Sequence, residues 1–355
     1  MPFKDGIFTS RAYSRAGLIG NPSDGFGGKT ISFTIYNYYA TIKLWPSEGF
    51  EIIPGEADRL KFKDDNMLVE HTQEYGYDGM VQIIAAAVTS FKKYFAEKGT
   101  PLRSRGYTIK YDTNIPRQRG MAGSSAVVTA TIRALMEFYD RQIPKRELPN
   151  VILGAEKGER GINAGLQDRV VQTYGGMVYM DFSGVKDTLK DQGQYAEMDP
   201  AQLPPVAVAY IRKNGGEASS KVHSDVTARW ERGEEEVVDA MGRFADLTDD
   251  AKMLIQSADD PTVKWKDLGR LMWQNWKQRT ELYNIRSCDQ KMIQAAREAG
   301  AYPKFAGSSG TAVMTYEDDR MFQALEERFD RLRQEDGIEA VIFRPTLLPT
   351  AARVT

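Results

Sequence analysis

The sequence predicts an α+β protein of two domains, and three observations support this prediction. The chain has 355 residues, which is long for a single hydrophobic core. Segments with strand-like alternation and segments with helical spacing follow one another in both halves of the chain. Between the halves, residues 183–205 are polar and contain prolines, as expected of a connection between domains. We therefore expect domains at residues 1–200 and 201–355.

The first half begins with two predicted strands. A short apolar run at residues 13–20 and a long β-branched and aromatic run at 29–45 have the patterns typical of strands. Turn-forming residues at 21–28 predict a loop between them. Further along this half we expect a helix at 79–94, a strand at 106–112, helices at 127–139 and 148–157, and a strand near 176–182.

The second half repeats the same two kinds of pattern. Its expected elements are a strand at 206–212, helices at 222–247, 251–257, 265–282 and 288–299, a glycine loop and strand at 305–315, a helix at 318–333 and a strand at 340–344. No internal repeat or low-complexity segment interrupts this order.

Composition excludes several classes of function. A formal net charge of -2 provides no basic field for nucleic acid or an anionic membrane. The single cysteine, Cys288, excludes an internal disulfide and a cysteine-rich zinc site, and the two histidines, His71 and His223, are too few for a histidine-rich metal site. The sequence has neither a bilayer-length apolar run nor a signal-peptide core, so the expected location is the cytoplasm.

Residues 114–126 carry the most informative motif. This segment, Asn-Ile-Pro-Arg-Gln-Arg-Gly-Met-Ala-Gly-Ser-Ser-Ala, lies between a predicted strand and a predicted helix. Unpaired N–H groups and the positive end of the helix dipole would meet there, and both suit a polyphosphate. Ser124 and Ser125 add hydroxyls that can bond a phosphate or bind Mg²⁺. The other interpretation is an ordinary helix with Ser124 as its N-cap. A Walker loop is excluded because no Gly-Lys-Ser/Thr follows the glycines.

Three further glycine-rich segments point to one shared site. Two are the loops at residues 20–28 and 306–310, and the third is a predicted loop at 161–169 that carries Asp168. A carboxylate there can accept the proton of an attacking hydroxyl, or orient that hydroxyl during phosphoryl transfer. Asp168 is equally consistent with a solvated surface charge beside Arg169.

Other polar residues also allow two interpretations. Glu156, on the predicted helix twelve positions before Asp168, can hold Mg²⁺ through one carboxylate, or it can be a solvated helix residue. Asn21 and Asp24 carry donors and acceptors for sugar hydroxyls, and both also suit the turn in which they lie.

Together these motifs resemble those of the GHMP kinases, the family of galactokinase, homoserine kinase, mevalonate kinase and phosphomevalonate kinase. Residues 115–126 resemble the family's phosphate loop, Pro-x-x-x-Gly-Leu-(Gly/Ser)-Ser-Ser-Ala. Residues 17–28 resemble its N-terminal substrate motif, and residues 305–312 its third, glycine-rich motif. The resemblance implies an α+β, two-domain GHMP kinase fold with an N-terminal domain like ribosomal protein S5 domain 2 and a ferredoxin-like C-terminal domain.

Shorter segments narrow the resemblance to the plant-type glucuronokinase branch of this family. They are residues 20–25, 112–118, 165–176 and 221–224. This branch implies an ATP-dependent kinase that phosphorylates the anomeric hydroxyl of a uronic acid, with D-glucuronate as the expected substrate. Galacturonate, galactose or a heptose as the substrate stays open, as does a sugar sensor that has lost catalysis. The expected partners are a small sugar acid and ATP, for a monomer or homodimer without nucleic acid or membrane.

The resemblance also implies roles for individual residues. Asp168 matches the catalytic aspartate, and Arg15 matches the basic residue that lowers the proton affinity of the hydroxyl. Mg²⁺ is expected at Glu156 with Ser124 or Ser125; the loop has one residue more than Gly-Leu-Gly-Ser-Ser, so the choice of serine stays open. ATP is expected at Pro116, Gly120, Ala122, Gly123, Ser124, Ser125 and Ala126. The sugar is expected at Asn21, Asp24, Arg169, Tyr174, Gly307 and Ser308.

A uronic acid carries a carboxylate, which a fixed arginine can bind through two hydrogen bonds. The basic residues in or beside the motif loops are Lys29, Arg117, Arg119 and Arg169. We predict Arg169 because it follows the expected catalytic aspartate.

Overall fold

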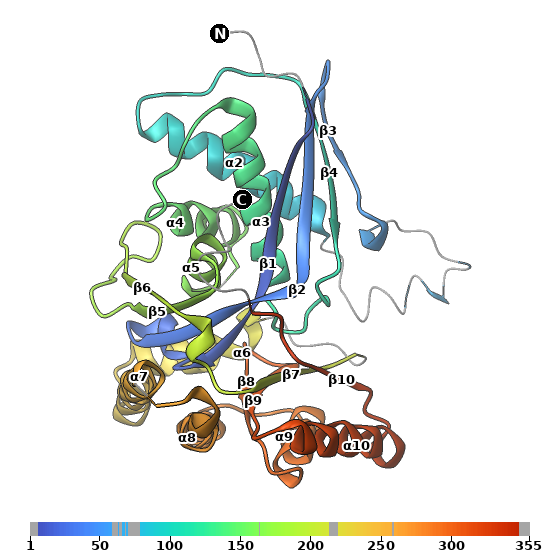
Figure 1. The fold of residues 1–355 in the computed structure, drawn as a ribbon. Coiled ribbons are helices and arrows are strands. Elements are labelled where there is room, and N and C mark those ends of the chain that lie inside the picture. Colours follow the sequence, from blue (N-terminus) through green and yellow to red (C-terminus); the bar gives the residue numbers. More distant parts are fainter. Residues whose placement is uncertain are drawn as a thin grey trace.

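The computed structural model describes residues 6–58, 63, 66, 67, 69, 79–162, 164–212, 219–257 and 259–347. These residues form a six-stranded sheet in the first half of the chain and a four-stranded sheet in the second, each with helices packed against it (Figure 1). The predicted α+β fold class is confirmed. His71 and the side chains of residues 221–224, which include His223, lie outside the described residues.

The N-terminal sheet is built around one long strand. Its strands are β1 (Phe8–Ile19), β2 (Lys29–Pro46), β3 (Phe50–Ile53), β4 (Tyr107–Thr113), β5 (Met177–Asp181) and β6 (Gln194–Met198). Their order is β3-β4-β2-β5-β6, with β1 paired to β2, and only the β3–β4 pair is parallel. The first residues of β2 pair with β5 and its last residues pair with β4, so β2 joins the two parts of the sheet.

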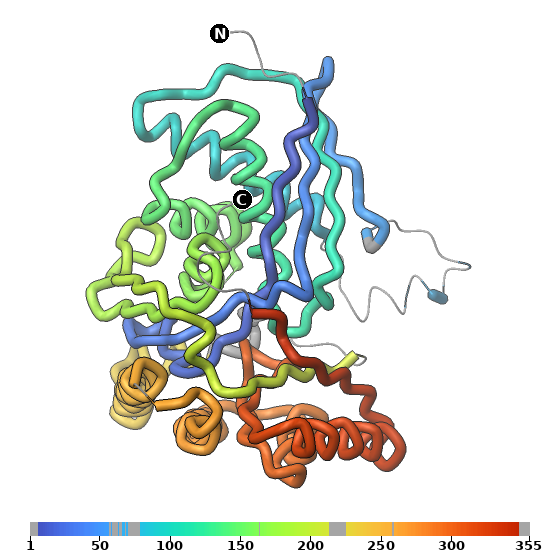
Figure 2. The backbone as a smooth tube through the Cα atoms, viewed as in Figure 1, coloured from blue at the N-terminus to red at the C-terminus, as the bar shows by residue number. Residues whose placement is uncertain are grey.

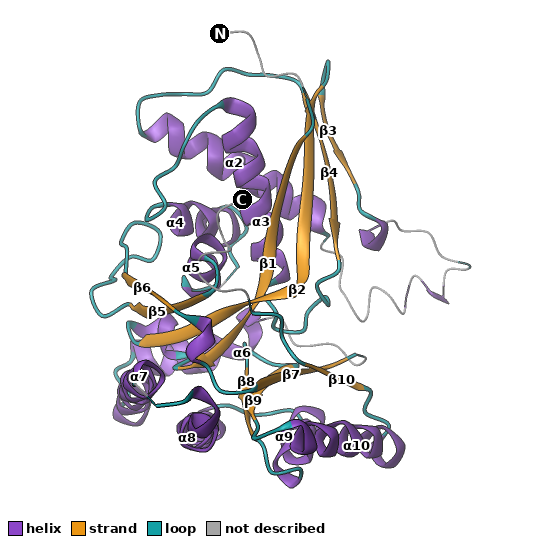
Figure 3. Cartoon of the chain, in the orientation of Figure 1, coloured by secondary structure: helices purple, strands orange, loops and turns teal. Residues whose placement is uncertain are grey.

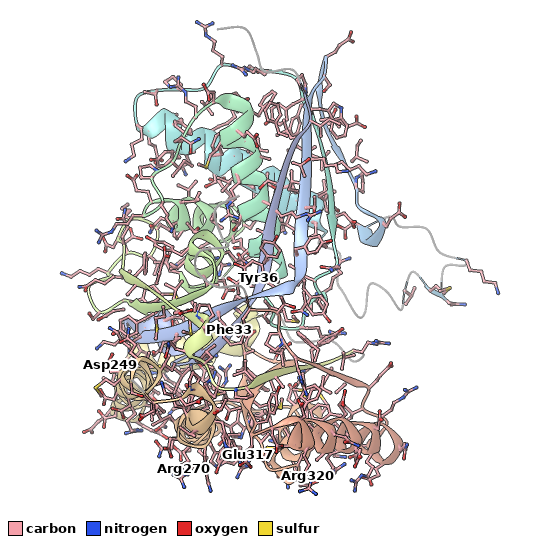
Figure 4. The ribbon with its side chains drawn as sticks, viewed as in Figure 1. Phe33, Tyr36, Asp249, Arg270, Glu317 and Arg320 are labelled. Carbon is pink, nitrogen blue, oxygen red and sulfur yellow. The ribbon has the colours of Figure 1, made fainter. Side chains whose placement is uncertain are left out.

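The β1–β2 ribbon bends near its middle. Tyr13 of β1 pairs with Tyr39 of β2. The next residue, Ser14, pairs with Ile35, so the intervening residues of β2 form a bulge. Bulges bend a strand and increase its twist. The bend lies beside the labelled Tyr36 in Figure 4 and directs the β1–β2 turn toward the second half of the chain.

Four helices cover one face of this sheet (Figure 3). They are α2 (Met80–Glu97), α3 (Gly123–Tyr139), α4 (Leu148–Leu153), which continues into a π-helical turn (Gly154–Gly158), and α5 (Gln167–Tyr174). Helix α3 packs between β1 and β2 on one side and α2 on the other, and most of its residues are buried. A helix that is apolar on nearly all sides belongs in the middle of a core.

The C-terminal sheet is antiparallel, in the order β10-β7-β9-β8. Its strands are β7 (Val206–Ile211), β8 (Tyr302–Phe305), β9 (Thr311–Thr315) and β10 (Ala340–Phe343). The helices of this half are α6 (Ser219–Glu231), α7 (Glu235–Gln256), α8 (Trp265–Leu282), α9 (Ser287–Glu298) and α10 (Asp319–Asp336). Short 3₁₀ turns are η1 (Ser23–Phe26), η2 (Glu56–Asp58), η4 (Pro200–Gln202) and η5 (Pro261–Lys264).

The two halves touch through the β1–β2 turn and the helices of the second half. Helix α7 contacts β2 and η1, and α8 contacts both β1 and β8. In Figure 2 the blue turn accordingly lies beside the yellow and orange helices. Near the other end of the chain, the Tyr36 N–H donates to the Thr346 carbonyl at 3.3 Å. The predicted division at residue 200 falls between β6 and β7 and stays a prediction.

Two helix predictions in the second half were wrong in their boundaries. The predicted helix at 222–247 is broken at Gly233, whose φ of 71° is left-handed and suits glycine. The predicted separate helix at 251–257 is instead the last part of α7. Thr248 does not interrupt it, because its hydroxyl donates to the carbonyls of Phe244 and Lys29.

Two predicted loops contain regular structure. The last residues of the predicted loop at 161–169 form the first turn of α5. This turn is polar, and the apolar residues that pack the helix come after it, so the helical pattern in the sequence begins too late. The polar connection at 183–205 contains β6, which pairs with β5 and extends the first sheet. In the described part of the chain, no helix is both long and apolar enough to cross a bilayer.

Candidate active site

The loop before α3 owes its shape to three left-handed residues. Gln118, Gly120 and Ala122 have φ values of 52°, 68° and 59°. Ala122 is the N-cap of α3, and within the described chain no side chain caps this end of the helix. The first N–H groups of α3 are therefore available to an anion. The alternative interpretation with Ser124 as the N-cap is wrong, because Ser124 lies inside the first turn.

This loop is pressed against the β8–β9 loop, residues 306–310. A Cβ on Gly120 would lie 2.5 Å from the Ser309 carbonyl oxygen. A Cβ on Gly307 would lie 2.4 Å from the Gly120 carbonyl oxygen. Side chains are excluded at both positions, so these glycines allow the two backbones to approach each other. Residues predicted to bind phosphate and sugar thus form one continuous surface.

Arg15 connects three segments of the site. Its Nε donates to Asp168 Oδ1 at 2.5 Å, and its Nη1 donates to the carbonyls of Gly120 at 2.7 Å and Ala306 at 3.2 Å. Burial opposes ionisation of Asp168, but the guanidinium groups of Arg15 and Arg169 hold the pKa of this carboxyl below its ordinary value. Asp168, in the first turn of α5, is therefore an anion at neutral pH.

Ser124 and Glu156 face each other beside the start of α3. The Ser124 hydroxyl donates to Glu156 Oε1 at 2.7 Å. Arg169 donates to the other oxygen of Glu156 from Nε at 2.9 Å and also from Nη2. Ser125 is buried and donates to the Ala122 carbonyl at 3.1 Å. Ser124, and not Ser125, is therefore the serine beside the acidic residue.

Ser124 and Glu156 supply oxygen donors of the kind that Mg²⁺ prefers. Mg²⁺ usually takes only one or two protein ligands together with substrate phosphates. The described residues contain no group of three or more His, Cys, Asp or Glu side chains that could hold a metal without such help. The donor set thus fits Mg²⁺ that arrives with a nucleotide.

Asp24, on the β1–β2 turn, lies close to Asp168. Burial raises the pKa of Asp24 from 3.8 to about 7, and the negative charge of Asp168 adds to this rise. The turn approaches the start of α5 closely, because a Cβ on Gly165 would lie 2.7 Å from Asp24 Oδ2. The neighbouring Asn21 donates from Nδ2 to the carbonyls of Phe305 at 3.3 Å and Gly307 at 3.4 Å. The turn is thereby fixed against the β8–β9 loop.

We expect Asp24→Asn to remove a pH dependence of stability. Because folding raises the pKa of Asp24, the folded chain binds more protons than the unfolded chain between about pH 4 and 7, and the free energy of unfolding falls as pH rises through this window. The contribution, up to about 4 kcal/mol, is complete at low pH and lost above neutrality. Urea unfolding at acidic and alkaline pH should show a smaller difference for Asp24→Asn than for the exposed control Asp267→Asn. Equal differences in the two variants would contradict this prediction.

Two of the residues predicted to bind the sugar, Tyr174 and Arg169, are not free to do so in the way the sequence suggested. Tyr174 ends α5, at the opposite end from Asp168, and its ring packs against Tyr195 and Lys145. Arg169 is buried, and its guanidinium also donates to the Gly165 carbonyl at 3.0 Å. The structure therefore does not bring Tyr174 to the site, and it brings Arg169 there already bonded to protein groups.

The other basic candidates for the substrate carboxylate also have protein partners. Lys29 pairs with Asp249 at 2.6 Å, and Arg117 pairs with Asp58 at 2.9 Å. Arg119 donates to the Arg212 carbonyl at 2.8 Å. None of these contacts involves the β8–β9 loop or α5, where the sugar is expected.

Sequence reasoning missed two buried basic residues at the site, Lys304 and Arg279. Lys304 immediately precedes the third glycine-rich motif. Arg279 lies three residues after Trp276 and three before Leu282, both of which are buried on the same helix. A basic residue on the apolar stripe of an amphipathic helix was the available signal.

Comparisons with known proteins show the family to which this chain belongs. The family model described as GHMP kinases N terminal domain matches residues 82–176. The Arabidopsis thaliana protein named probable glucuronokinase 2 is 39% identical over 317 residues, which are 87% of this chain and 84% of that protein. Glucuronokinase 1 of the same plant is 38% identical over 310 residues, 86% of this chain and 83% of that protein.

A solved structure agrees with these sequence comparisons. Lactococcus lactis galactokinase complexed with galactose superposes with a TM-score of 0.70 and 14% identity, over 96% of this chain and 93% of that chain. The family model and the two plant relatives show a sugar kinase. The chain belongs to the GHMP kinase family, which confirms the resemblance found in the sequence.

Proposed function

We propose that the protein is an ATP- and Mg²⁺-dependent kinase that phosphorylates the anomeric hydroxyl of D-glucuronate. The observation that carries this proposal is the ionised Asp168, paired at 2.5 Å with Arg15, which also donates to carbonyls of the predicted phosphate loop and of the β8–β9 loop. The names of the two plant relatives support a uronic acid as the acceptor. The galactokinase supports only the fold, because it is 14% identical.

In this proposal Asp168 positions the acceptor hydroxyl. Because its pKa is held low, Asp168 is a weak base, and it accepts a hydrogen bond from the hydroxyl and aims the oxygen at the terminal phosphate. Phosphoryl transfer through a loose transition state depends mainly on such positioning and on charge stabilisation. Arg15 keeps Asp168 ionised and offsets the charge that develops beside it.

The phosphates would lie at the start of α3. Backbone N–H groups there donate to phosphate oxygens, with the helix dipole adding to the attraction. Ser124 and Glu156 would hold Mg²⁺, which neutralises phosphate charge when bound. Arg169 balances the second oxygen of Glu156, so that this carboxylate keeps one oxygen directed at Ser124. On the other side, Asp24 would accept hydrogen bonds from sugar hydroxyls.

The direct test is release of ADP from ATP across a panel of sugars. We expect turnover with glucuronate, dependence on Mg²⁺, and a product whose ³¹P NMR signal couples to the anomeric proton. A much higher kcat/KM for galactose or a heptose would contradict glucuronate as the substrate. Nucleotide binding without turnover of any sugar would instead favour the sensor.

A further inference from the structure

Arg279 is a buried cation with unused hydrogen-bond donors. It lies in the last turn of α8, and its side chain is 1% exposed. Nη2 donates to the Ser308 carbonyl at 2.9 Å, whereas Nε and Nη1 have no hydrogen-bond partner among the described residues. Buried donors without partners are rare and costly, and more so on a charged group. A buried guanidinium with unpaired donors indicates a binding site for an anionic ligand.

The surroundings of Arg279 compensate only part of this cost. Its Cζ lies 4.9 Å from the centre of the Tyr283 ring and 5.3 Å from that of Phe305. Ring faces attract the cation but do not accept its in-plane N–H groups. The nearby Asp289 is already engaged, since it accepts from Arg286 at 2.7 Å and from the Gly310 N–H at 3.2 Å.

The electrostatic field around Arg279 also favours an anion. Lys304 is buried close by, and burial together with the charges of Arg279 and Arg15 lowers the pKa of Lys304 well below its ordinary value. Among the described residues, its Nζ donates to three neutral oxygens, one of which is Asn21 Oδ1 at 2.5 Å. Asp24, whose charge also acts on Arg279, has a pKa of about 7 and is only partly ionised at neutral pH.

Arg279 lies on the face of α8 that meets the site. Residues four apart in a helix share a face, and Asn275 is four positions before Arg279. Asn275 accepts from the Gly20 N–H at 2.7 Å and donates to the Asn21 carbonyl at 3.2 Å, so it holds the β1–β2 turn. Arg279 therefore reaches the same region one turn further along.

The β8–β9 loop links Arg279 to the predicted catalytic residues. Its three successive carbonyls accept from three different side chains: Ala306 from Arg15, Gly307 from Asn21 and Ser308 from Arg279. Successive Cα atoms are about 3.8 Å apart, so Ala306 and Ser308 are separated by at most roughly 7.6 Å. A monosaccharide with its anomeric hydroxyl at Asp168 can therefore extend its far end toward Arg279.

We infer that Arg279 is the specificity residue that binds the carboxylate of the uronic acid. This inference rests on the proposed function and deepens it, by naming the group that recognises the acid. The unpaired N–H groups of a planar guanidinium match the two oxygens of a carboxylate. Arg279 replaces Arg169 in this role, because Arg169 is bonded to Glu156 and Asp168.

The test compares Arg279→Met and Arg279→Lys with Arg270→Met. Arg270 lies on the same helix but is exposed and pairs only with Asp267 among the described residues, and Figure 4 shows it at the outer side of α8. For each variant, kcat/KM is measured with glucuronate, with the neutral glucuronamide and with glucose, and KM is measured for ATP. The rise in melting temperature on adding glucuronate is recorded as a binding signal that does not require turnover.

We expect Arg279→Met to lower kcat/KM for glucuronate at least ~100-fold, because truncating one partner of a buried charge pair weakens binding strongly. The values for glucuronamide and glucose and the KM for ATP should change less than about threefold, so that discrimination for the acid is lost. Arg279→Lys should retain part of the discrimination, and Arg270→Met all of it. The melting temperature without sugar should not fall in Arg279→Met, because an incompletely paired buried charge is removed, while the rise caused by glucuronate should disappear.

Three results would overturn the inference while leaving the proposed function intact. One is an equal loss for the acid and the neutral sugars, which would make Arg279 a structural residue. Another is a raised KM for ATP with unchanged sugar discrimination, which would place a phosphate at Arg279. The third is unchanged kinetics with glucuronate. Failure of the unaltered protein to phosphorylate any uronic acid would contradict the proposed function and the inference together.

Discussion

Replacing Asp168 with asparagine is expected to lower kcat by about 10²- to 10⁴-fold, because the charged hydrogen-bond acceptor that orients the attacking hydroxyl is lost. Asparagine keeps an oxygen that can accept from Arg15 Nε, so the fold of the site should persist. It loses the negative charge that polarises the acceptor hydroxyl. Single-turnover kinetics with saturating ATP and sugar measure the chemical step directly.

ATP binding provides the control for this prediction. Asp168 does not belong to the phosphate loop, and its observed partners are Arg15 and Arg169. The Kd for ATP should therefore change less than about threefold in Asp168→Asn and in Asp168→Ala. Activity close to that of the unaltered protein in either variant would rule out the proposed role of Asp168.

The second large effect is expected at the pair of serines that open α3. Ser124→Ala should lower kcat/KM for ATP by about 10- to 100-fold and raise the Mg²⁺ concentration needed for half-maximal activity, because it removes the hydroxyl that faces Glu156. Glu156→Gln should have a larger effect of the same kind. It should also lower the free energy of unfolding, by less than the about 3–5 kcal/mol expected for an uncompensated buried charge, because Arg169 loses Glu156 but keeps Asp168 as a charge partner.

Ser125→Ala is the matched control for Ser124→Ala. Ser125 is the adjacent residue, and its hydroxyl donates to the Ala122 carbonyl of the same turn. Its removal should cost about 0.5–1.5 kcal/mol of stability and leave the Mg²⁺ dependence unchanged. Mg²⁺ titrations of the initial rate distinguish the two serines. A shift with Ser125→Ala and none with Ser124→Ala would reverse the proposed assignment.

Local patterns predicted most elements of the fold. The long β-branched run at 29–45 correctly predicted β2, and the helical spacing at 265–282 correctly predicted α8. Such patterns are reliable because they reflect which face of each element is buried. The errors at residues 161–169 and 183–205 arose where polar segments gained structure from their neighbours. Strand β6, for example, exists because β5 offers it a paired edge.

In the candidate site, too, local patterns predicted some features, whereas others depend on neighbouring segments. The glycines and serines of residues 114–126 predicted a phosphate loop, because a strand–loop–helix junction has the required N–H groups whatever surrounds it. The choice between Ser124 and Ser125 required the position of Glu156. Arg169 is predicted as the carboxylate ligand because it follows Asp168 in the sequence, and this adjacency carries no information about the Arg169–Glu156 pair.

The sequence by itself determined the family, most of the order of the elements and the loops predicted to hold phosphate and sugar, because these depend on residue types at fixed local spacing. The tertiary structure decided which charges are paired and which are left for a ligand. Arg15 donates a hydrogen bond to Asp168, 153 positions further along the chain, and Arg279 donates one to the Ser308 carbonyl, 29 positions further along. Charge pairing over such separations is set by how the sheets and helices pack, and no local pattern in the sequence encodes it.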